Sequence, residues 1–255
     1  MCGIVGAIAK RNITPILIEG LRRLEYRGYD SAGVAVLATG NGIKRTRAVG
    51  KVIELENALE AAPIYGHLGI AHTRWATHGK PAEHNAHPHM SERLAIVHNG
   101  IIENHNQLRK KLQELGYNFT SETDTEVVAH LLAYHYGQKQ NLLCAFRATL
   151  AELHGAYALG VIHQDEPNTL YCARMGSPLV IGEGSEERFI ASDPLALLQV
   201  TDQFIYLEEG DHARLTLESR EVWNRQNELM DYPVLRYEHA AHSLEKGEYR
   251  HFMLK

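Results

Sequence analysis

The chain has 255 residues, of which 44% are hydrophobic and 22% charged, and its formal net charge is −5. This composition predicts a globular protein with one large core or two modest ones and excludes a disordered chain. No apolar run approaches the roughly 18 residues of a membrane-spanning helix, and neither a secretory signal nor a basic run is seen. We therefore expect a cytoplasmic protein with no membrane and no nucleic-acid partner.

The first half of the chain alternates between helical and strand patterns. Thr14 and Pro15 suit the N-cap and first position of a helix whose apolar stripe runs to Leu24. Glycine-marked turns bound two strands that pair as a hairpin. Further helices are predicted over 52–62, over 105–115 with a capping box of Asn104 and Gln107, from 121 onward, and over 142–153; strands are predicted over 34–37, 43–49, 68–71 and 94–98.

From Ala156 onward the pattern changes to short strands separated by turns, with one helix over 194–200. The predicted strands cover 156–162, 170–173, 179–181, 189–191, 205–207 and 213–217. Regular signals fade beyond Asn224. The pattern predicts an α+β sandwich without repeated βαβ units, with a domain over 1–224 and a tail or linker over 225–255.

Three cysteines are present, without disulfide or metal-ligand spacing, which suits a reducing compartment. Cys144 and Cys172 lie in apolar contexts and are expected in the core. Cys2 stands at the start of an apolar run with the pattern of a buried strand. Removal of Met1 would give this residue a free α-amine, so that a sulfur nucleophile and a general base would share one residue. A small buried hydrophobic residue is the alternative interpretation of Cys2, and the first six residues alone do not decide between them.

A polar segment over 80–93 lacks periodicity and is predicted to be a long surface loop. His84, His87 and His89 within it have spacings that a metal ion could use. Loop histidines beside a proline are more often solvated, and no cysteine or carboxylate completes a recognisable ligand set. We predict no metal site and no cofactor.

Five motifs occur in one order along the chain: the CGIVG start, YRGYDSAG (26–33), HTRWATHG (72–79), HNGIIEN (98–104) and SETDTE (121–126). Together they resemble the glutaminase domains of the glucosamine-6-phosphate synthase family, which are class II amidotransferases of the N-terminal-nucleophile hydrolase group. The resemblance runs from Cys2 into the tail, and implies a four-layer αββα sandwich. It also implies that the family's sugar-isomerase half is missing here, and that the full-length protein is a homodimer.

The resemblance assigns roles to residues of these motifs. It implies that Cys2 attacks the side-chain amide of L-glutamine and forms a thioester, with Asn99 and the backbone N–H of Gly100 as the oxyanion hole. Without the resemblance, Asn99-Gly100 would be interpreted as a turn. The ammonia released would aminate fructose 6-phosphate in the missing half.

The substrate's two charged ends need counter-charges, and the resemblance places Arg74 at the α-carboxylate and Asp124 at the α-ammonium. It adds Thr77 and His78 as polar contacts and Trp75 as part of a closing loop. Arg27 is placed near the nucleophile in a supporting role, although pairing with Asp30 would explain it equally. Two alternatives stay open: a glutamine-binding module without turnover, and a domain that supplies ammonia to a different acceptor.

Overall fold

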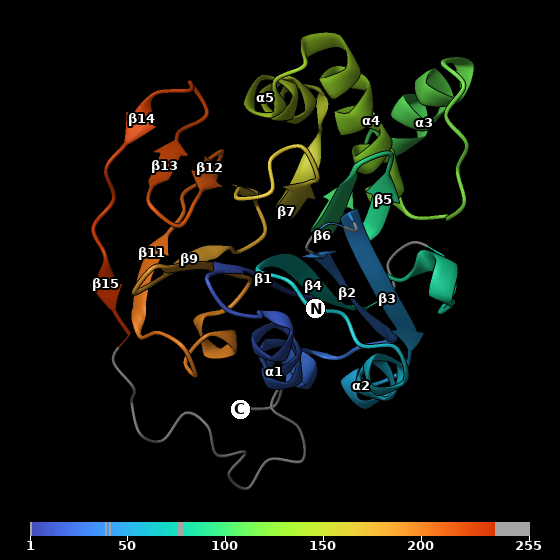
Figure 1. Cartoon of the computed structure of the whole chain (residues 1–255). Coiled ribbons are helices and arrows are strands. Elements are labelled where there is room, and N and C mark those ends of the chain that lie inside the picture. Colours follow the sequence, from blue (N-terminus) through green and yellow to red (C-terminus); the bar gives the residue numbers. More distant parts are fainter. Residues whose placement is uncertain (1, 39, 41, 76–78, 238–255) are drawn as a thin grey trace, which may run out of the picture.

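The computed structural model describes residues 2–38, 40, 42–75 and 79–237. Two antiparallel sheets lie face to face, and helices cover the outer face of each (Figure 1). The helices are α1 (Thr14–Leu24) and α2 (Val52–Ala61) on one side, and α3 (His105–Glu114), α4 (Asp124–Lys139) and α5 (Leu142–Glu152) on the other. Short 3-10 helices occupy Glu25–Arg27, Glu83–Asn85 and Pro194–Ala196. The predicted four-layer αββα sandwich is therefore confirmed.

The first sheet has the strand order β15-β11-β9-β10-β1-β4-β2-β3. Its strands are β1 (Gly3–Ala9), β2 (Ser31–Ala38), β3 (Gly42–Val49), β4 (Leu68–Arg74), β9 (Val180–Gly184), β10 (Glu187–Ala191), β11 (Gln203–Tyr206) and β15 (Leu235–Arg236). Because β1 pairs with β4 on one side and with β10 on the other, the first strand of the chain is interior to the sheet.

The second sheet has the order β14-β13-β12-β8-β7-β6-β5. Its strands are β5 (His89–Ser91), β6 (Leu94–Ile102), β7 (Gly155–His163), β8 (Leu170–Met175), β12 (His212–Leu215), β13 (Arg220–Trp223) and β14 (Leu229–Met230). The longest pairing joins β6 to β7 and places Asn99 opposite Ala158 and Gly100 opposite Tyr157.

Three apolar layers hold the four structural layers together. One lies between the first sheet and α1 and α2, one between the two sheets, and one between the second sheet and α3, α4 and α5. Alternate residues of a strand enter different layers: Val5 faces α1, whereas Ile4 and Ile8 face the second sheet. Side chains at positions of equal parity along a strand therefore share a face.

Several predicted boundaries are wrong in detail. Thr14 is the first residue of α1 rather than its N-cap, because its hydroxyl donates to the carbonyl of Ile64. Asn104 makes no cap hydrogen bond to α3; its side chain bonds the carbonyl of Glu152 and the N–H of His154. The helix predicted over 194–200 is only a 3-10 turn over 194–196.

The segment 80–93 is not a solvated loop. It contains a 3-10 turn and strand β5, which pairs with β6 through His89 and Ile96. His87 and His89 are buried, and only His84 is exposed. Their rings are buried because the hydroxyls of Thr125 and Thr123 provide hydrogen-bond partners inside the protein.

Two further expectations concern cysteine and the tail. Cys172 is buried as predicted, but Cys144 is exposed because it occupies the outward side of α5. The described part of the tail, up to 237, adds β14 and β15 to the edges of the two sheets. A domain boundary near 224 stays a proposal, and the sheets continue across it.

Candidate active site

Cys2 directly precedes β1, at one edge of the layer between the sheets. Cys2 has the parity of Ile4 and Ile8, which face that layer. On β4, His72 alternates onto the same face as Leu68 and Ile70, which lie in that layer. On β6, Asn99 is on the same face as Ala95 and Val97, which also lie in that layer. Strand pairing places Gly3 opposite Thr73, so that the end of β4 lies beside Cys2. The alternation of strand residues thus brings Cys2, His72 and Asn99 together.

The thiol of Cys2 is held by the backbone that leaves β4. The N–H of Trp75 donates to Sγ at 3.1 Å, and Sγ lies 3.5 Å from the carbonyl oxygen of Trp75. Burial raises the pKa of the Cys2 thiol, and the Trp75 N–H acts in the opposite direction because it favours the thiolate. Activation of this thiol therefore requires a base close to it.

The side-chain amide of Asn99 has a fixed orientation. Its Nδ2 donates to the carbonyl oxygen of Cys2 at 3.1 Å, and its Oδ1 lies 2.9 Å from His72 Nε2. The same nitrogen lies 2.9 Å from the carbonyl oxygen of His98. Since both neighbours of His72 Nε2 are acceptors, this nitrogen must carry the proton and donate to them. His72 thereby directs the N–H groups of Asn99 toward Cys2.

His72 is suited to a permanently neutral role. Its ring is fully buried, and burial lowers its pKa to about 3. A neutral imidazole has one N–H, and here both hydrogen-bond acceptors lie at Nε2. The sequence interpretation missed His72, because the predicted strand stops at 71, whereas β4 continues to Arg74 and carries His72 on the face of Leu68 and Ile70.

Gly100 borders the same cavity as Cys2 and cannot be replaced without a clash. Its φ is +125°, and a Cβ atom there would lie 2.0 Å from the carbonyl oxygen of Ala156. Such a φ favours glycine, because L side chains rarely adopt it. The residue therefore lets β6 and β7 approach closely where the strand passes the thiol.

Arg74 and Asp124 line the cavity with Cys2 and Gly100. Arg74 is 3% exposed and donates to the carbonyl oxygens of Gly79 and Lys80, and it forms an ion pair with Asp30 at 3.4 Å. Asp124 is the first residue of α4.

Asp124 is 4% exposed and accepts a hydrogen bond from the N–H of Ile102 at 2.9 Å. The structure thus places a buried cation and a buried carboxylate on the wall of one cavity.

A buried histidine cluster, consisting of His72, His87, His89 and His98, backs this cavity. His72 and His87 stack with ring centroids 4.2 Å apart. The hydroxyl of Thr125 lies 2.6 Å from His87 Nε2 and 3.0 Å from His98 Nδ1. Burial lowers the pKa of His87 and His89 well below the usual value for histidine, so both rings are neutral near pH 7.

The cavity beside Cys2 measures about 20 Å³, about the room that one water molecule needs. Glutamine is far larger, so binding requires part of the wall to move. Trp75 belongs to that wall and is 53% exposed. Its ring packs on Gly28, where a Cβ atom would lie 2.3 Å from the indole.

Three other residues were predicted to belong to the site: Arg27, Thr77 and His78. Arg27 pairs with Asp193 and Tyr26 rather than with Asp30, so the pairing considered from the sequence is wrong. Thr77 and His78 lie outside the described residues.

Among the described residues, no group of three or more histidine, cysteine or acidic side chains is arranged to hold a metal ion. None of the described helices is both long and apolar enough to cross a membrane.

Comparison with known protein families decides the class. A model of the glutamine amidotransferase domain matches residues 72–199, which is half of the chain and includes His72, Arg74, Asn99 and Asp124. The chain belongs to the glutamine amidotransferase domain family. The resemblance seen in the motifs is therefore confirmed.

Curated relatives of this amidotransferase domain are similar over its whole length. Glutamine–fructose-6-phosphate aminotransferase (isomerizing) of Pseudomonas aeruginosa is 59% identical over 256 aligned residues, which cover 100% of this chain and 42% of the relative. The enzyme of the same name from Acinetobacter baylyi is 58% identical, with coverage of 100% and 41%. The chain thus spans less than half the length of the curated relatives that it matches.

Solved structures confirm the fold of the amidotransferase domain. The glutamine phosphoribosylpyrophosphate amidotransferase of B. subtilis, complexed with ADP and GMP, superimposes with a TM-score of 0.77 at 26% identity. The superposition covers 89% of this chain and 50% of that one. A glutamine aminotransferase class-II domain protein from Silicibacter pomeroyi has a TM-score of 0.60 at 19% identity, which shows the shared fold alone.

Proposed function

We propose that this chain hydrolyses the side-chain amide of L-glutamine to glutamate and ammonia, with Cys2 as the nucleophile. The observation that carries the proposal is the position of the Asn99 amide, whose Nδ2 lies 3.1 Å from the carbonyl oxygen of Cys2. Gly100 lines the same small cavity as the thiol. A nucleophile beside two N–H donors is the arrangement that acyl transfer needs.

The reaction proceeds in two steps. The thiolate of Cys2 attacks the amide carbon, and the oxyanion of the tetrahedral intermediate accepts hydrogen bonds from Asn99 Nδ2 and the Gly100 N–H. The carbon–nitrogen bond breaks, ammonia leaves with an added proton, and a thioester remains. Water then attacks the thioester, which releases glutamate and restores the thiol.

A base must take the thiol proton, because burial raises the pKa of the Cys2 thiol. We assign this role to the α-amine of Cys2, which becomes free when Met1 is removed. Its reference pKa of about 7.7–8.0 suits proton transfer near neutrality.

Selectivity for glutamine rests on its two charged ends. We assign the α-carboxylate to Arg74, whose planar guanidinium can bind both oxygens, and the α-ammonium to Asp124. Both side chains are buried beside Cys2, which strengthens their attraction for opposite charges. Thr77, His78 and Trp75 complete the substrate contacts in this proposal, and Arg27 supports the segment that precedes β2.

In a longer protein like the relatives, the ammonia would aminate fructose 6-phosphate in the sugar-isomerase half, and the protein would be a cytoplasmic homodimer. This part of the proposal rests on the relatives' names and on the motifs. The alternative is that the ammonia is delivered to an acceptor other than fructose 6-phosphate, in a different partner domain.

The test follows glutamate release from glutamine after intact-mass analysis has shown whether Met1 is removed. We expect turnover in the processed protein, none in Cys2→Ala, and normal turnover in Cys144→Ala, which alters an exposed thiol. Equal turnover in Cys2→Ala refutes the mechanism. Saturable glutamine binding without glutamate release by the processed protein indicates a binding module instead.

A further inference from the structure

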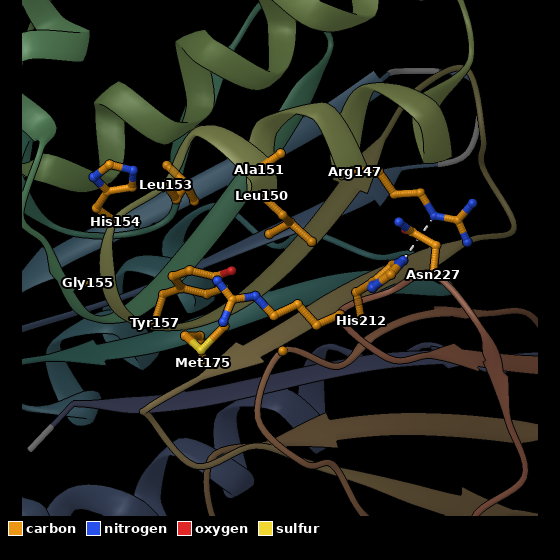
Figure 2. Close-up of a pocket in the computed structure, with 12 residues that line it drawn as sticks. Arg147, Leu150, Ala151, Leu153, His154, Gly155, Tyr157, Met175, His212 and Asn227 are labelled. Carbon is orange, nitrogen blue, oxygen red and sulfur yellow. Dashed lines mark hydrogen bonds between the residues drawn. The ribbon is translucent and has the colours of Figure 1, made fainter.

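A second cavity lies on the other side of the strand pair that carries Gly100. It measures about 490 Å³ and is enclosed by the C-terminal half of α5, the start of β7, the end of β8, the start of β12 and the turn after β13 (Figure 2). Tyr157, which is paired with Gly100 in the sheet, faces this cavity together with Met175. Its volume is in the range of small-molecule sites, about 300–1,000 Å³.

The polar side chains of this second cavity are predominantly basic. Arg147, Arg225, His154 and His212 line it, and none of the described lining residues is acidic. Neither arginine forms an ion pair within the described part of the chain. The cavity therefore has positive charge without a fixed counter-charge from its own wall.

Nearby carboxylates are already occupied. Glu209 binds Arg174 at 3.0 Å and accepts a hydrogen bond from the N–H of Gly176. Glu152, at the end of α5, binds Lys111 and His135. The two lining arginines are thus left for an external anion.

Arg147 is held rigidly although no carboxylate binds it. Its Nε donates to His212 Nε2 at 3.0 Å, as Figure 2 shows, and its guanidinium lies over the ring of Trp223 at 4.6 Å. The His212 ring stacks on the same indole with an interplanar angle of 23°. Because His212 accepts this hydrogen bond, it is neutral, and it leaves the charge of Arg147 uncompensated.

One nitrogen of this guanidinium also lacks a partner. Arg147 Nη2 is buried and has no acceptor among the described residues. Buried donors in folded proteins usually have an acceptor from the protein, from water or from a ligand. An anion in the cavity would accept from Nη2 only after the side chain turned this nitrogen toward the open volume.

Arg225 approaches the cavity from a different segment. Its aliphatic stem packs on Gly210, where a Cβ atom would lie 2.8 Å from Arg225 Cβ. Its charge acts on the phenol of Tyr157, whose pKa is raised by burial and by the charge of Glu209 and lowered in part by Arg225. Apolar surface from Leu150, Leu153 and Met175 completes the wall.

We propose that this second cavity binds a phosphomonoester with a compact ring, whose phosphate is recognised by Arg147 and Arg225 and whose body packs on Tyr157 and Met175. Arginine is suited to phosphate because its planar N–H groups match the geometry of the oxygens. A sugar phosphate and a nucleoside monophosphate share this chemistry.

The test is calorimetric titration of the 255-residue protein with inorganic phosphate, a hexose phosphate, a nucleoside monophosphate and a dicarboxylate of similar size. We expect at least one ester to bind with a Kd below about 1 mM and more tightly than inorganic phosphate. The ester that binds most tightly shows whether the non-phosphate part of the ligand is a sugar or a nucleoside. Absence of saturable binding up to about 10 mM, or a dicarboxylate that binds as well, overturns the proposal.

Substitutions locate the binding. Arg225→Met keeps the stem on Gly210 and removes the charge, and Arg147→Met does the same beside Trp223. Each should weaken binding about tenfold or more, whereas Arg23→Met, on α1 and paired with Glu19, should not.

Circular dichroism checks that each variant is folded, and if Arg147→Met is not, Arg225→Met alone decides. Wild-type affinity in Arg225→Met refutes the site. Competition by an acidic peptide that binds more tightly than every ester would also refute it and would indicate a protein-docking surface.

Discussion

Replacement of His72 tests whether the orientation of Asn99 matters for catalysis. His72→Phe keeps a ring of similar size in the buried position and removes the N–H that binds Asn99 Oδ1 and the His98 carbonyl. Without that donor, the Asn99 amide is no longer fixed and can rotate so that Nδ2 faces the His98 carbonyl, at the expense of its hydrogen bond to the Cys2 carbonyl oxygen. Its Oδ1 then faces Cys2, where it would repel a developing oxyanion.

The expected magnitude has an upper bound. Complete loss of one oxyanion-hole donor costs about 10²–10³ in kcat, and partial misorientation costs less, so we expect a fall of about 10²-fold. KM should change little, because Arg74 and Asp124 are untouched. The variant should also lose about 1–3 kcal/mol of stability for each buried acceptor left unmet.

The assay compares glutaminase rates in wild type, His72→Phe, Asn99→Ala and the double variant. If His72 acts through Asn99, the two effects are not additive, and His72→Phe should cost little in the Asn99→Ala background. An active wild type whose kcat is unchanged in His72→Phe contradicts the reasoning. So does an equal loss in both backgrounds. An inactive wild type would instead contradict the proposed function.

Three further predictions concern reactivity and stability. Burial raises the pKa of Cys2, so its alkylation rate should still be climbing at pH 9, and peptide mapping should show the exposed Cys144 labelled first at pH 7. Equal labelling at pH 7 would contradict this burial. Gly100→Ala should lose at least about 2 kcal/mol in urea unfolding through its clash, whereas Gly116→Ala, at φ +92° with open space, should lose only about 1 kcal/mol. Similar losses in both would show that the clash is relieved.

The pKa of His212 is lowered to about 4, mainly by burial, so between pH 6.5 and pH 4 the unfolded state binds more protons. The free energy of unfolding should therefore fall as pH falls, by about 1.4 kcal/mol per pH unit from this group, and His212→Gln should flatten that slope. An unchanged slope in the variant would refute the assignment.

Periodicity predicted most of the elements because their faces differ in polarity. α1 has a clear apolar stripe, and the sequence predicts a helix that stops before Arg27; the structure ends α1 at Leu24 and continues it as a 3-10 turn over Glu25–Arg27. The sequence predicts the next helix from 121 onward, whereas α4 begins at Asp124 after its N-cap Thr123. Eleven of its sixteen residues are buried, so no single apolar face marks its limits. β5 was missed because His89, Met90 and Ser91 carry no strand pattern; pairing with β6 makes them a strand. The four layers themselves followed from the motifs rather than from periodicity.

The candidate site was partly predictable for a similar reason. Cys2, Arg74, Asn99 and Asp124 fall in motifs, and the structure brings all four to one cavity or its edge. His72 was missed because a buried histidine on an apolar strand has no sequence signal for its hydrogen-bond partners. The same applies to His87 and His89, which look solvated in sequence and are buried through contacts with the start of α4.

The alternation of residues along β1, β4 and β6 limits how this chemistry can be altered or reused. An insertion of one residue near the end of any of these strands would turn its functional side chain to the opposite face of the sheet. Insertions and deletions are therefore tolerated in the connecting turns, whereas at the strand ends they abolish the site. Grafting this nucleophile onto another sandwich fold would require the ends of three strands, aligned so that their functional side chains face the same layer. No single contiguous peptide contains all of these residues.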